Sequence, residues 1–370
     1  MNTQIHQVVD RTLLAIVILL VVIGFLIFSS ASLGLLARQG ASFSSVATSQ
    51  FLFGLVGGGI AMFITSQIHY RFWRKYAFYI FIASLCATLL VFAPGIGFEH
   101  GGAHRWIHIL GFSMQPSELL KIGFVIYMAT FLSGVQKQID DIKRGLLPFL
   151  AISGAAGISL LIQPDTDTFA LMGMAAMAMF VVAGARIRDI AIIFGMSIVL
   201  LAILAVYRPY PMDRFTTFMH PDADTQGSGW QINQSLIAVG SGGLIGRGFG
   251  QSVQKFEFLP EPIGDSIFAV YAEEFGFLGS VILIALFAAF TFRGFKIASH
   301  STDLFGMLLV VGFMTMIVAQ AFLNIAAMIA IAPLMGLPLP FISHGGTALL
   351  ATLASVGIVL NVSKYQKRIL

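Results

Sequence analysis

Charged residues are scarce in this sequence. Of its 370 residues only 10% are Asp, Glu, Lys or Arg, whereas 57% are hydrophobic, and the mean hydropathy is +0.89. A soluble domain carries roughly 25% charged residues. The composition therefore excludes an ordinary soluble protein and indicates an integral membrane protein. Because no polar stretch is long enough to fold alone, we expect one membrane domain over residues 1–370.

Cysteine is nearly absent, and the basic residues form no cluster. The only cysteine, Cys86, lies in an apolar run and cannot form an intramolecular disulfide. The net charge is +4, and the basic residues are spread over short loops. This distribution argues against nucleic-acid binding and for control of membrane topology. The glycines between residues 227 and 250 match neither glycine-rich nucleotide-binding pattern. We therefore expect no organic cofactor.

Long hydrophobic runs make up most of the chain. A membrane-spanning helix needs about 20 mostly apolar residues, and this predicts an all-α protein with ten transmembrane helices. They cover about residues 12–33, 50–68, 76–93, 116–134, 146–162, 168–185, 189–206, 266–293, 304–332 and 342–362. With the N-terminus in the cytoplasm, thirteen Lys and Arg residues of the loops and termini lie inside and six outside. This positive-inside bias predicts that both termini are cytoplasmic.

One polar, glycine-rich segment, about residues 207–265, separates the seventh and eighth predicted helices. In the predicted topology it is a large extracytoplasmic loop, and residues 100–114, 163–167 and 333–341 lie on the same face. So much polar chain on one face of a membrane protein indicates chemistry or recognition there. The glycines of the loop fit either tight turns or an anion-binding backbone.

Five carboxylates lie at or near the outer ends of predicted helices. Asp265 ends the loop, and Glu273 and Glu274 follow at helical spacing. Ionisable residues that enter a membrane are costly and are functional candidates by default, although an aspartate at this place also suits a helix N-cap. Asp165 and Asp167 either hold a divalent cation such as Mg²⁺ or Mn²⁺, or serve a helix end, with Asp167 as the expected cap.

Several cations lie on the same predicted face. Glu118 and Lys121 are spaced to pair on one helix, either as a structural ion pair or as a means of presenting a cation to an anionic group. Arg105 is suited to a phosphate because its guanidinium offers a planar fork of donors. Arg214 and Lys255 are further outer cations. Together they predict a substrate with a phosphate end and a reactive hydroxyl or sugar.

Seven segments in order along the chain resemble the SEDS family (shape, elongation, division and sporulation), the ten-span bacterial proteins FtsW and RodA. They are GGAHRW (101–106), QPSELLK (115–121), QPD (163–165), GSGWQINQSLIAVGSGGLIGRGFGQS (227–252), FLPEPIGDSIFA (258–269), AEEFGFLG (272–279) and GLPLPFISHGGTALL (336–350). The combination of GSGWQ with LPEP and LPLPFIS favours the FtsW-like division branch over the RodA-like elongation branch.

The resemblance implies a peptidoglycan glycosyltransferase that polymerises lipid II, an undecaprenyl-pyrophosphate-linked disaccharide-peptide, at the outer face of the bacterial cytoplasmic membrane. The implied partners are a class B penicillin-binding transpeptidase and other membrane proteins of division or elongation. The catalytic aspartate of the family corresponds to Asp265. Other important charged positions of the family correspond to Arg105, Glu118, Lys121 and Asp165, and more loosely to Arg214.

The implied chemistry agrees with these residue types. The attacking sugar hydroxyl must lose a proton, which a positioned carboxylate accepts as general base. The lipid pyrophosphate that leaves needs cations or a metal ion. An α-linked donor that gives a β-linked product requires inversion without a covalent enzyme intermediate. Arg105 and Lys121 are then the cations near the phosphates, and Glu118 orients Lys121.

The chain departs from the family at three places. Ile263-Gly264-Asp265 replaces the common HTD, QPDTDT (163–168) replaces QPDLGT, and SHGGT (343–347) replaces SYGGS. The aspartate is kept, but its hydrogen-bonding environment and its pKa are expected to differ. Two other functions compete with catalysis: a transporter or flippase for the same lipid, and a non-catalytic scaffold that recruits a transpeptidase. Ionisable residues at the outer ends of the helices, rather than at the midplane, favour catalysis.

Overall fold

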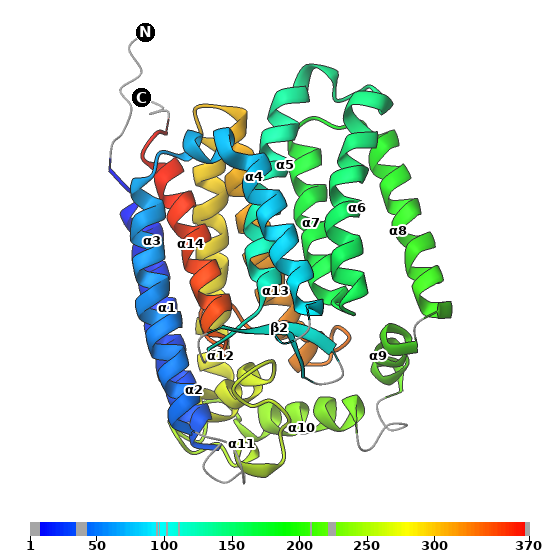
Figure 1. Ribbon diagram of the computed structural model, residues 1–370. Coiled ribbons are helices and arrows are strands. Elements are labelled where there is room, and N and C mark those ends of the chain that lie inside the picture. The colour runs from blue at the N-terminus through cyan, green and yellow to red at the C-terminus, as the bar shows by residue number, and fades with distance from the viewer. Residues whose placement is uncertain are drawn as a thin grey trace.

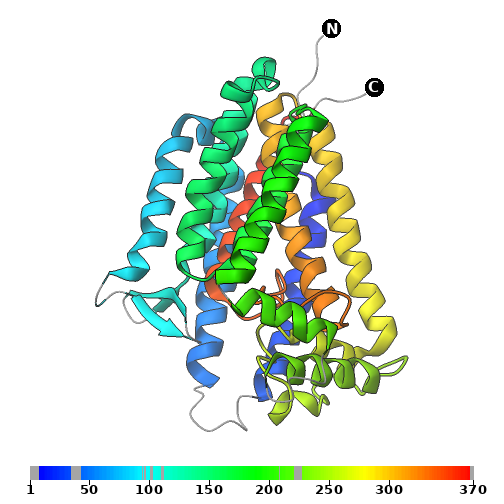
Figure 2. The ribbon, with the colours of Figure 1, turned by 90° about the vertical axis from the view of Figure 1, so that its right-hand side faces the viewer.

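The protein is a bundle of long helices that run between the two ends of the molecule (Figures 1 and 2). The computed structural model describes residues 8–34, 43–93, 95, 97–100, 103–109, 112–207, 209–220 and 227–366. The start of α1 and the end of α14 lie together at one end of the bundle (Figure 1). Short helices and a small sheet gather at the other end, which we call the loop end.

Eight of the described helical stretches are long and apolar enough to cross a membrane. They are formed by α1 (Arg11–Ser32), α2 with η2 and α3 (Phe43–Ser49, Gln50–Gly57, Gly58–Gln67), α4 with η3 (Tyr70–Leu89, Leu90–Phe92), α5 with η4 (Pro116–Val135, Gln136–Gln138), η5 with α6 (Ile142–Leu146, Leu147–Ile162), α12 (Ile267–Ser299), α13 (Leu304–Met328) and α14 (Gly346–Ser363). Two further helices, α7 (Thr166–Val182) and α8 (Ile187–Tyr207), occupy the remaining predicted spans. The all-α membrane fold is confirmed, while the number of ten spans and the orientation stay predictions.

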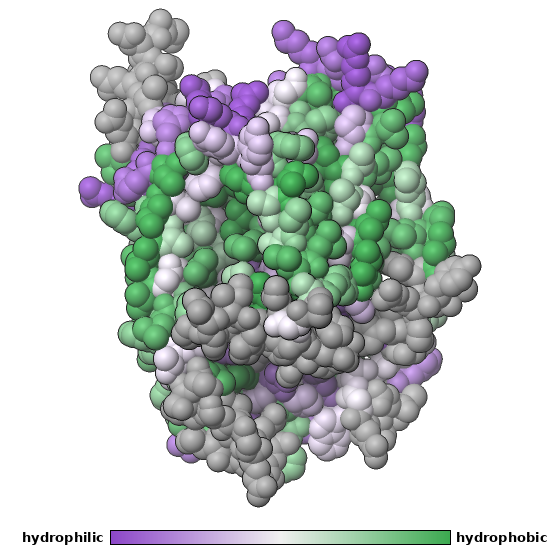
Figure 3. Space-filling view, viewed as in Figure 1, coloured by the Kyte–Doolittle hydropathy of each residue, from purple (hydrophilic) through white to green (hydrophobic). Residues whose placement is uncertain are grey.

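The face of the bundle seen in Figure 3 carries an apolar belt across its middle. In Figure 3 hydrophobic residues cover the long helices, and hydrophilic residues collect at the two ends. Side chains that face lipid need no polar partner, which is why large apolar residues such as Phe63 and Phe292 are 65% and 73% exposed. The protein is therefore a multi-pass membrane protein.

The loop end is more structured than the sequence predicted. The segment expected as a loop contains α9 (Pro209–Met219), α10 (Ser228–Ser241) and α11 (Gln254–Glu257). Before α5, a three-stranded antiparallel sheet has the order β1 (Gly97–His100), β2 (Ala103–Ile109) and β3 (Phe112–Met114). This sheet was not predicted, since its strands are only three to seven residues long and give no clear alternation.

Glycines of the loop allow its backbone to enter a break in α12. Gly276 has φ 67° and ψ −163° inside the helix, and Phe277 donates its N–H to the Gly243 carbonyl at 2.9 Å. A Cβ on Gly276 would lie 2.3 Å from the nitrogen of Gly246, and a Cβ on Gly246 would lie 2.1 Å from the Glu274 carbonyl oxygen. Only glycine permits such an approach, so these glycines serve close backbone packing and turns.

Of the eight described spans, α13 and α14 are the most buried. In these two, 72% and 78%, respectively, of an apolar stretch of 18 residues lies inside the protein. Polar side chains on α13 consequently point into protein rather than lipid. Gln320 is 5% exposed and Asn324 is fully buried. A buried amide needs hydrogen-bond partners, and the NH₂ groups of both side chains find them in the loop that follows α13.

Candidate active site at the loop end

Asp265 belongs to the turn that precedes α12, one residue before its N-cap Ser266. The loop between α13 and α14 braces this turn. Ser343 donates its hydroxyl to the Gly264 carbonyl at 2.7 Å, and the His344 N–H donates to the Ile263 carbonyl at 2.7 Å. Asp265 is thus presented by a backbone held in place from a distant part of the chain.

Two amides on α13 hold the same turn and loop from inside the bundle. The Nδ2 atom of Asn324 donates to the carbonyl oxygens of Asp265 and Leu337, both at 2.8 Å. One turn earlier, the Nε2 atom of Gln320 donates to the Pro338 carbonyl at 2.7 Å. Sequence reasoning missed both amides. Their spacing of four residues within an apolar run was the available signal, because it places two polar groups on one helix face.

Three charged side chains from separate elements meet above Gly336. The Nη1 atom of Arg214, on α9, lies 2.6 Å from the Oδ2 atom of Asp167, in the first turn of α7. The same Oδ2 atom accepts the Gly336 N–H at 2.9 Å. A Cβ built on Gly336 would lie 3.5 Å from Asp167 Oδ2, 3.6 Å from Asp265 Oδ2 and 3.7 Å from Arg214 Nη2. The structure therefore brings Asp265, Asp167 and Arg214 together.

The surroundings of Asp265 disfavour its ionised form. Burial, followed by the negative charges of Glu261 and Asp167, raises the pKa of Asp265 to about 7, although Arg214 and Arg105 act in the opposite direction. The ordinary pKa of an aspartate is close to 3.8. A carboxyl that titrates near neutral pH is suited to accept a proton, because a general base is most effective when its pKa lies near the working pH.

Arg105 and Asp165 flank the start of α7. From β2, the guanidinium of Arg105 donates to the carbonyl oxygens of Gln163, at 3.2 Å, and Pro164. Asp165 is the N-cap of α7 and accepts the Thr168 N–H at 3.3 Å. The helix cap was predicted at Asp167, which instead lies in the first turn of α7. Burial raises the pKa of Asp165, and the nearby Arg105 opposes this effect. Arg105 thus joins the sheet to the turn that carries Asp165.

Glu118 and Lys121 form the predicted ion pair at the start of α5. Their Oε2 and Nζ atoms are 2.8 Å apart, and the two side chains are 7% and 9% exposed. The Nζ atom of Lys121 also donates to the Oε1 atom of Gln320 at 3.3 Å. A cavity of about 20 Å³ adjoins the pair, which is enough for a single water molecule. The pairing is confirmed, and a direct role of Lys121 in phosphate binding stays a prediction.

Lys255 was predicted to bind phosphate, and the structure gives it another role. Its side chain is fully buried, and its Nζ atom contacts Glu274 Oε1 at 2.8 Å, Ser30 Oγ at 3.0 Å and the Gly250 carbonyl oxygen at 2.9 Å. An ammonium has three donors, and all three are used here. Lys255 therefore fastens the loop to α1 and α12, and we withdraw it from the substrate site.

Glu273 and Glu274 support the loop rather than the carboxylate of Asp265. Glu273 accepts the N–H groups of Val253, at 3.1 Å, and Gln254, at 3.3 Å, while Glu274 pairs with the buried lysine described above. A helix rises 1.5 Å per residue, so the two glutamates lie roughly 12 Å along α12 from Asp265. Their supporting role is structural, because they keep α11 and its flanking loop on α12.

The two aspartates predicted as possible metal ligands both have partners within the protein. Across the described part of the chain, no group of three or more His, Cys, Asp or Glu side chains could hold a metal ion. Asp167 already accepts from Arg214 and from the Gly336 N–H, and Asp165 caps α7. A need for Mg²⁺ or Mn²⁺, and ligation by Asp165 or Asp167, stay predictions.

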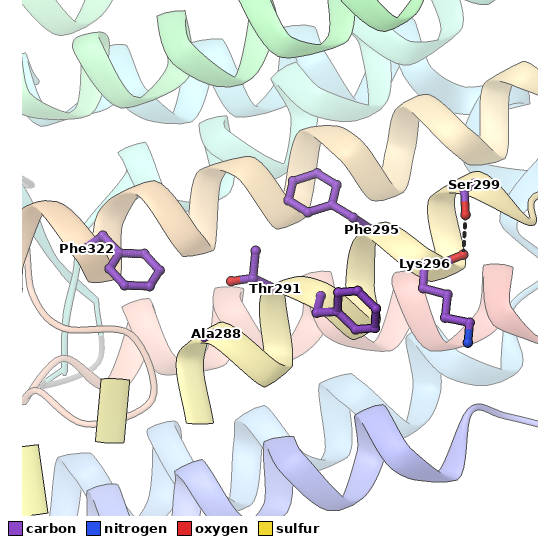
Figure 4. A pocket seen from close by; sticks show the side chains of 7 residues that line it. Ala288, Thr291, Phe295, Lys296, Ser299 and Phe322 are labelled. Atoms are coloured by element: carbon purple, nitrogen blue, oxygen red, sulfur yellow. Dashed lines mark hydrogen bonds between the residues drawn. The ribbon is translucent and has the colours of Figure 1, made fainter. Parts of the chain in front are cut away.

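A separate groove lies between α12 and α13 and shares no lining residue with the charged groups described above (Figure 4). Its volume is about 660 Å³, and its lining is almost entirely apolar. It is lined by Ala288, Thr291, Phe292, Phe295, Lys296, Ser299 and Phe322. We call it the α12–α13 groove.

Comparison with known proteins gives a consistent result. A family model for FtsW, RodA and SpoVE, described as cell cycle protein, matches residues 10–368. The chain is 38% identical to stage V sporulation protein E of Bacillus subtilis over 97% of this chain and 98% of the relative. It is 39% identical to the probable peptidoglycan glycosyltransferase FtsW of Geobacter metallireducens over 84% of this chain and 83% of the relative.

Solved structures share the fold. A chain of a peptidoglycan synthase complex, described as coordinating polymerization and crosslinking, superposes with a TM-score of 0.79 at 25% identity, covering 97% of this chain and 99% of the other. An aspartate-to-alanine variant of the rod shape determining protein RodA of Thermus thermophilus gives 0.70 at 25% identity, covering 97% and 99%. From the fold, the motifs and these similarities, the chain belongs to the FtsW/RodA/SpoVE family of cell cycle proteins.

Proposed function

We propose that this protein is a peptidoglycan glycosyltransferase that polymerises lipid II at the outer face of the bacterial cytoplasmic membrane. The observation that carries the proposal is the meeting of Asp265, Asp167 and Arg214 above Gly336, at the loop end of the bundle. A base and a cation side by side suit a reaction in which a hydroxyl loses a proton and a pyrophosphate leaves. The sequence relatives named as probable peptidoglycan glycosyltransferases support it.

Asp265 acts as the general base in this proposal. The sugar hydroxyl of the acceptor gives its proton to the Asp265 carboxylate while its oxygen attacks the anomeric carbon of the donor. The bond between that carbon and the pyrophosphate breaks, and the configuration inverts in one displacement. The pKa of Asp265, raised by burial to about 7, makes it a stronger base than an exposed aspartate while leaving it substantially ionised near neutral pH.

The negative charge that develops on the lipid pyrophosphate requires cations close to the base. Arg214 is placed for this task, since its Nη2 atom lies as near to the space over Gly336 as the Asp265 carboxylate does. Arg105 on β2 and Lys121 at the start of α5 are the further cations of this proposal. Glu118 holds Lys121 at 2.8 Å and so limits its motion. This arrangement favours catalysis over transport, because these groups lie at one end of the bundle.

A class B penicillin-binding transpeptidase is the partner we propose, since a structural neighbour is a chain of a peptidoglycan synthase complex. The α12–α13 groove suits the membrane helix of such a partner. Its lining is almost entirely apolar and includes Phe292, which is 73% exposed. Packing of a second helix there would cover this side chain. Other membrane proteins of division or elongation would join the same assembly.

The test is polymerisation by purified protein, with and without a verified transpeptidase partner, using lipid II as the only substrate. Wild type is expected to give glycan polymer, and Asp265→Ala is expected to give none without a fall in its thermal unfolding midpoint. Equal polymer from both proteins would remove Asp265 from the mechanism. No polymer from wild type with its partner, together with lipid II movement across vesicles, would favour a transporter. Inactivity in both assays would favour a scaffold.

A further inference from the structure

The backbone at Gly336 forms an open surface within the candidate active site. Gly336 is exposed, although Leu337 and Leu339, which follow it closely in the chain, are only 3% and 1% exposed. The three charged groups that face its α-carbon come from α7, α9 and the turn before α12, so no single element defines the space between them. Its φ angle lies outside the left-handed region. Glycine is therefore not required here for backbone conformation.

We propose that Gly336 keeps open the space in which the acceptor hydroxyl meets Asp265, so that the absence of a side chain at this position is a requirement of the reaction. The proposal rests on the glycosyltransferase function proposed above. A Cβ on Gly336 would lie 3.6 Å from the Oδ2 atom of Asp265. A hydroxyl that donates to this oxygen must place its own oxygen at about 2.7–2.8 Å. A methyl group on Gly336 would occupy that approach.

The same distances show why a methyl group would not unfold the protein. Contacts of 3.5, 3.6 and 3.7 Å with the three charged groups are ordinary van der Waals distances. By contrast, a Cβ on Gly246 or Gly276 would come within 2.1 or 2.3 Å of backbone atoms, which no rearrangement of a side chain relieves. Gly336 therefore differs from the glycines that serve packing. Its substitution is expected to affect the reaction rather than the fold.

The backbone that carries Gly336 is held on both sides. Its own N–H donates to Asp167 at 2.9 Å, and the next two carbonyl groups accept from the α13 amides Asn324 and Gln320. A fixed backbone cannot move aside for a methyl group without breaking these bonds. The hydroxyl that enters the space would lie between the base and the guanidinium of Arg214. Its proton passes to Asp265, its oxygen bonds to the anomeric carbon, and the pyrophosphate departs with the electron pair of the broken bond.

The experiment compares Gly336→Ala with Gly240→Ala, a matched control on α10 where a Cβ would meet no atom within 4 Å. Initial rates of polymerisation are measured against lipid II concentration with the partner present, and thermal unfolding is measured for each protein. We expect Gly336→Ala to keep its unfolding midpoint and to lose activity on the order of 10- to 100-fold, since displacement by about 1 Å has such an effect on a reacting pair. Gly240→Ala should polymerise lipid II at the wild-type rate. Gly336→Val should polymerise it more slowly than Gly336→Ala.

Two results would overturn the inference. Wild-type rates in Gly336→Ala would show that the space over this residue is not used by the acceptor. An alanine variant that fails to fold would show that the space is not open, contrary to the geometry. Either outcome can be separated from failure of the proposed function, because wild type and Gly240→Ala would still polymerise lipid II. If neither of those proteins polymerises lipid II, the glycosyltransferase function itself is refuted.

Discussion

Polymerisation of lipid II is expected to rise about tenfold between about pH 6 and about pH 8, because the proposed base must be ionised to act. With a pKa of about 7, roughly one tenth of Asp265 carries its charge at pH 6 and roughly nine tenths at pH 8. An aspartate at its ordinary pKa would be almost fully ionised at both values, so its rate would not change. A tenfold rise is easily distinguished from a flat profile, so the measurement tells whether the pKa of Asp265 is raised.

The assay is the pH dependence of kcat/KM for lipid II, which reports the free protein. The pyrophosphate diester of the substrate stays ionised over this range. Asp167→Asn provides a second profile: Glu261 and Asp167 raise the pKa of Asp265, while Arg214 and Arg105 lower it, so loss of the Asp167 charge should shift the rise to lower pH. A flat wild-type profile, or one that Asp167→Asn leaves in place, would refute the reasoning.

The pH dependence of folding stability tests the raised pKa of Asp265 independently of activity. Because the pKa of Asp265 is higher in the folded protein than in the unfolded chain, its contribution to stability is present at low pH and is lost as pH rises through about 7. Asp265→Asn removes the charge that the surroundings disfavour. The variant should therefore raise Tm relative to wild type more at about pH 8 than at about pH 6. An equal difference at both values would contradict the shifted pKa.

Three further predictions concern the groups around the site. Lys255→Met should lower the free energy of unfolding by about 3–5 kcal/mol, because it leaves Glu274 buried and unpaired, and adding Glu274→Gln should recover part of the loss in thermal or denaturant unfolding. Asn324→Ala removes the donor shared by two backbone carbonyls, so we expect a loss of about 1–3 kcal/mol together with a lower kcat; unchanged kcat would argue against its positioning of Asp265. Thr291→Trp should fill the α12–α13 groove and weaken co-purification of the transpeptidase without reducing Tm, whereas unchanged co-purification would place the partner elsewhere.

Membrane insertion and the approximate helices follow from the sequence alone. Apolar runs of about 20 residues can satisfy their backbone in lipid only as helices, so length and hydropathy predict them wherever they occur. The pair Glu118–Lys121 was also predictable, because it depends on residues three apart on one helix. A helix cap was predicted near the start of α7, but at Asp167 rather than at Asp165. Asp265 was identified by its motif and by its place at the start of a span.

The site itself depended on tertiary structure. The meeting of Asp265 with Asp167 and Arg214 joins segments about 50 to 100 residues apart, and no local spacing predicts which charged groups share a space. Lys255 illustrates the limit: as a cation in an outer loop it resembled a phosphate ligand, yet folding buries it against Glu274. Gly336 lacks any side chain to attract attention. Its importance follows from what faces it, and that arrangement exists only after the bundle has packed.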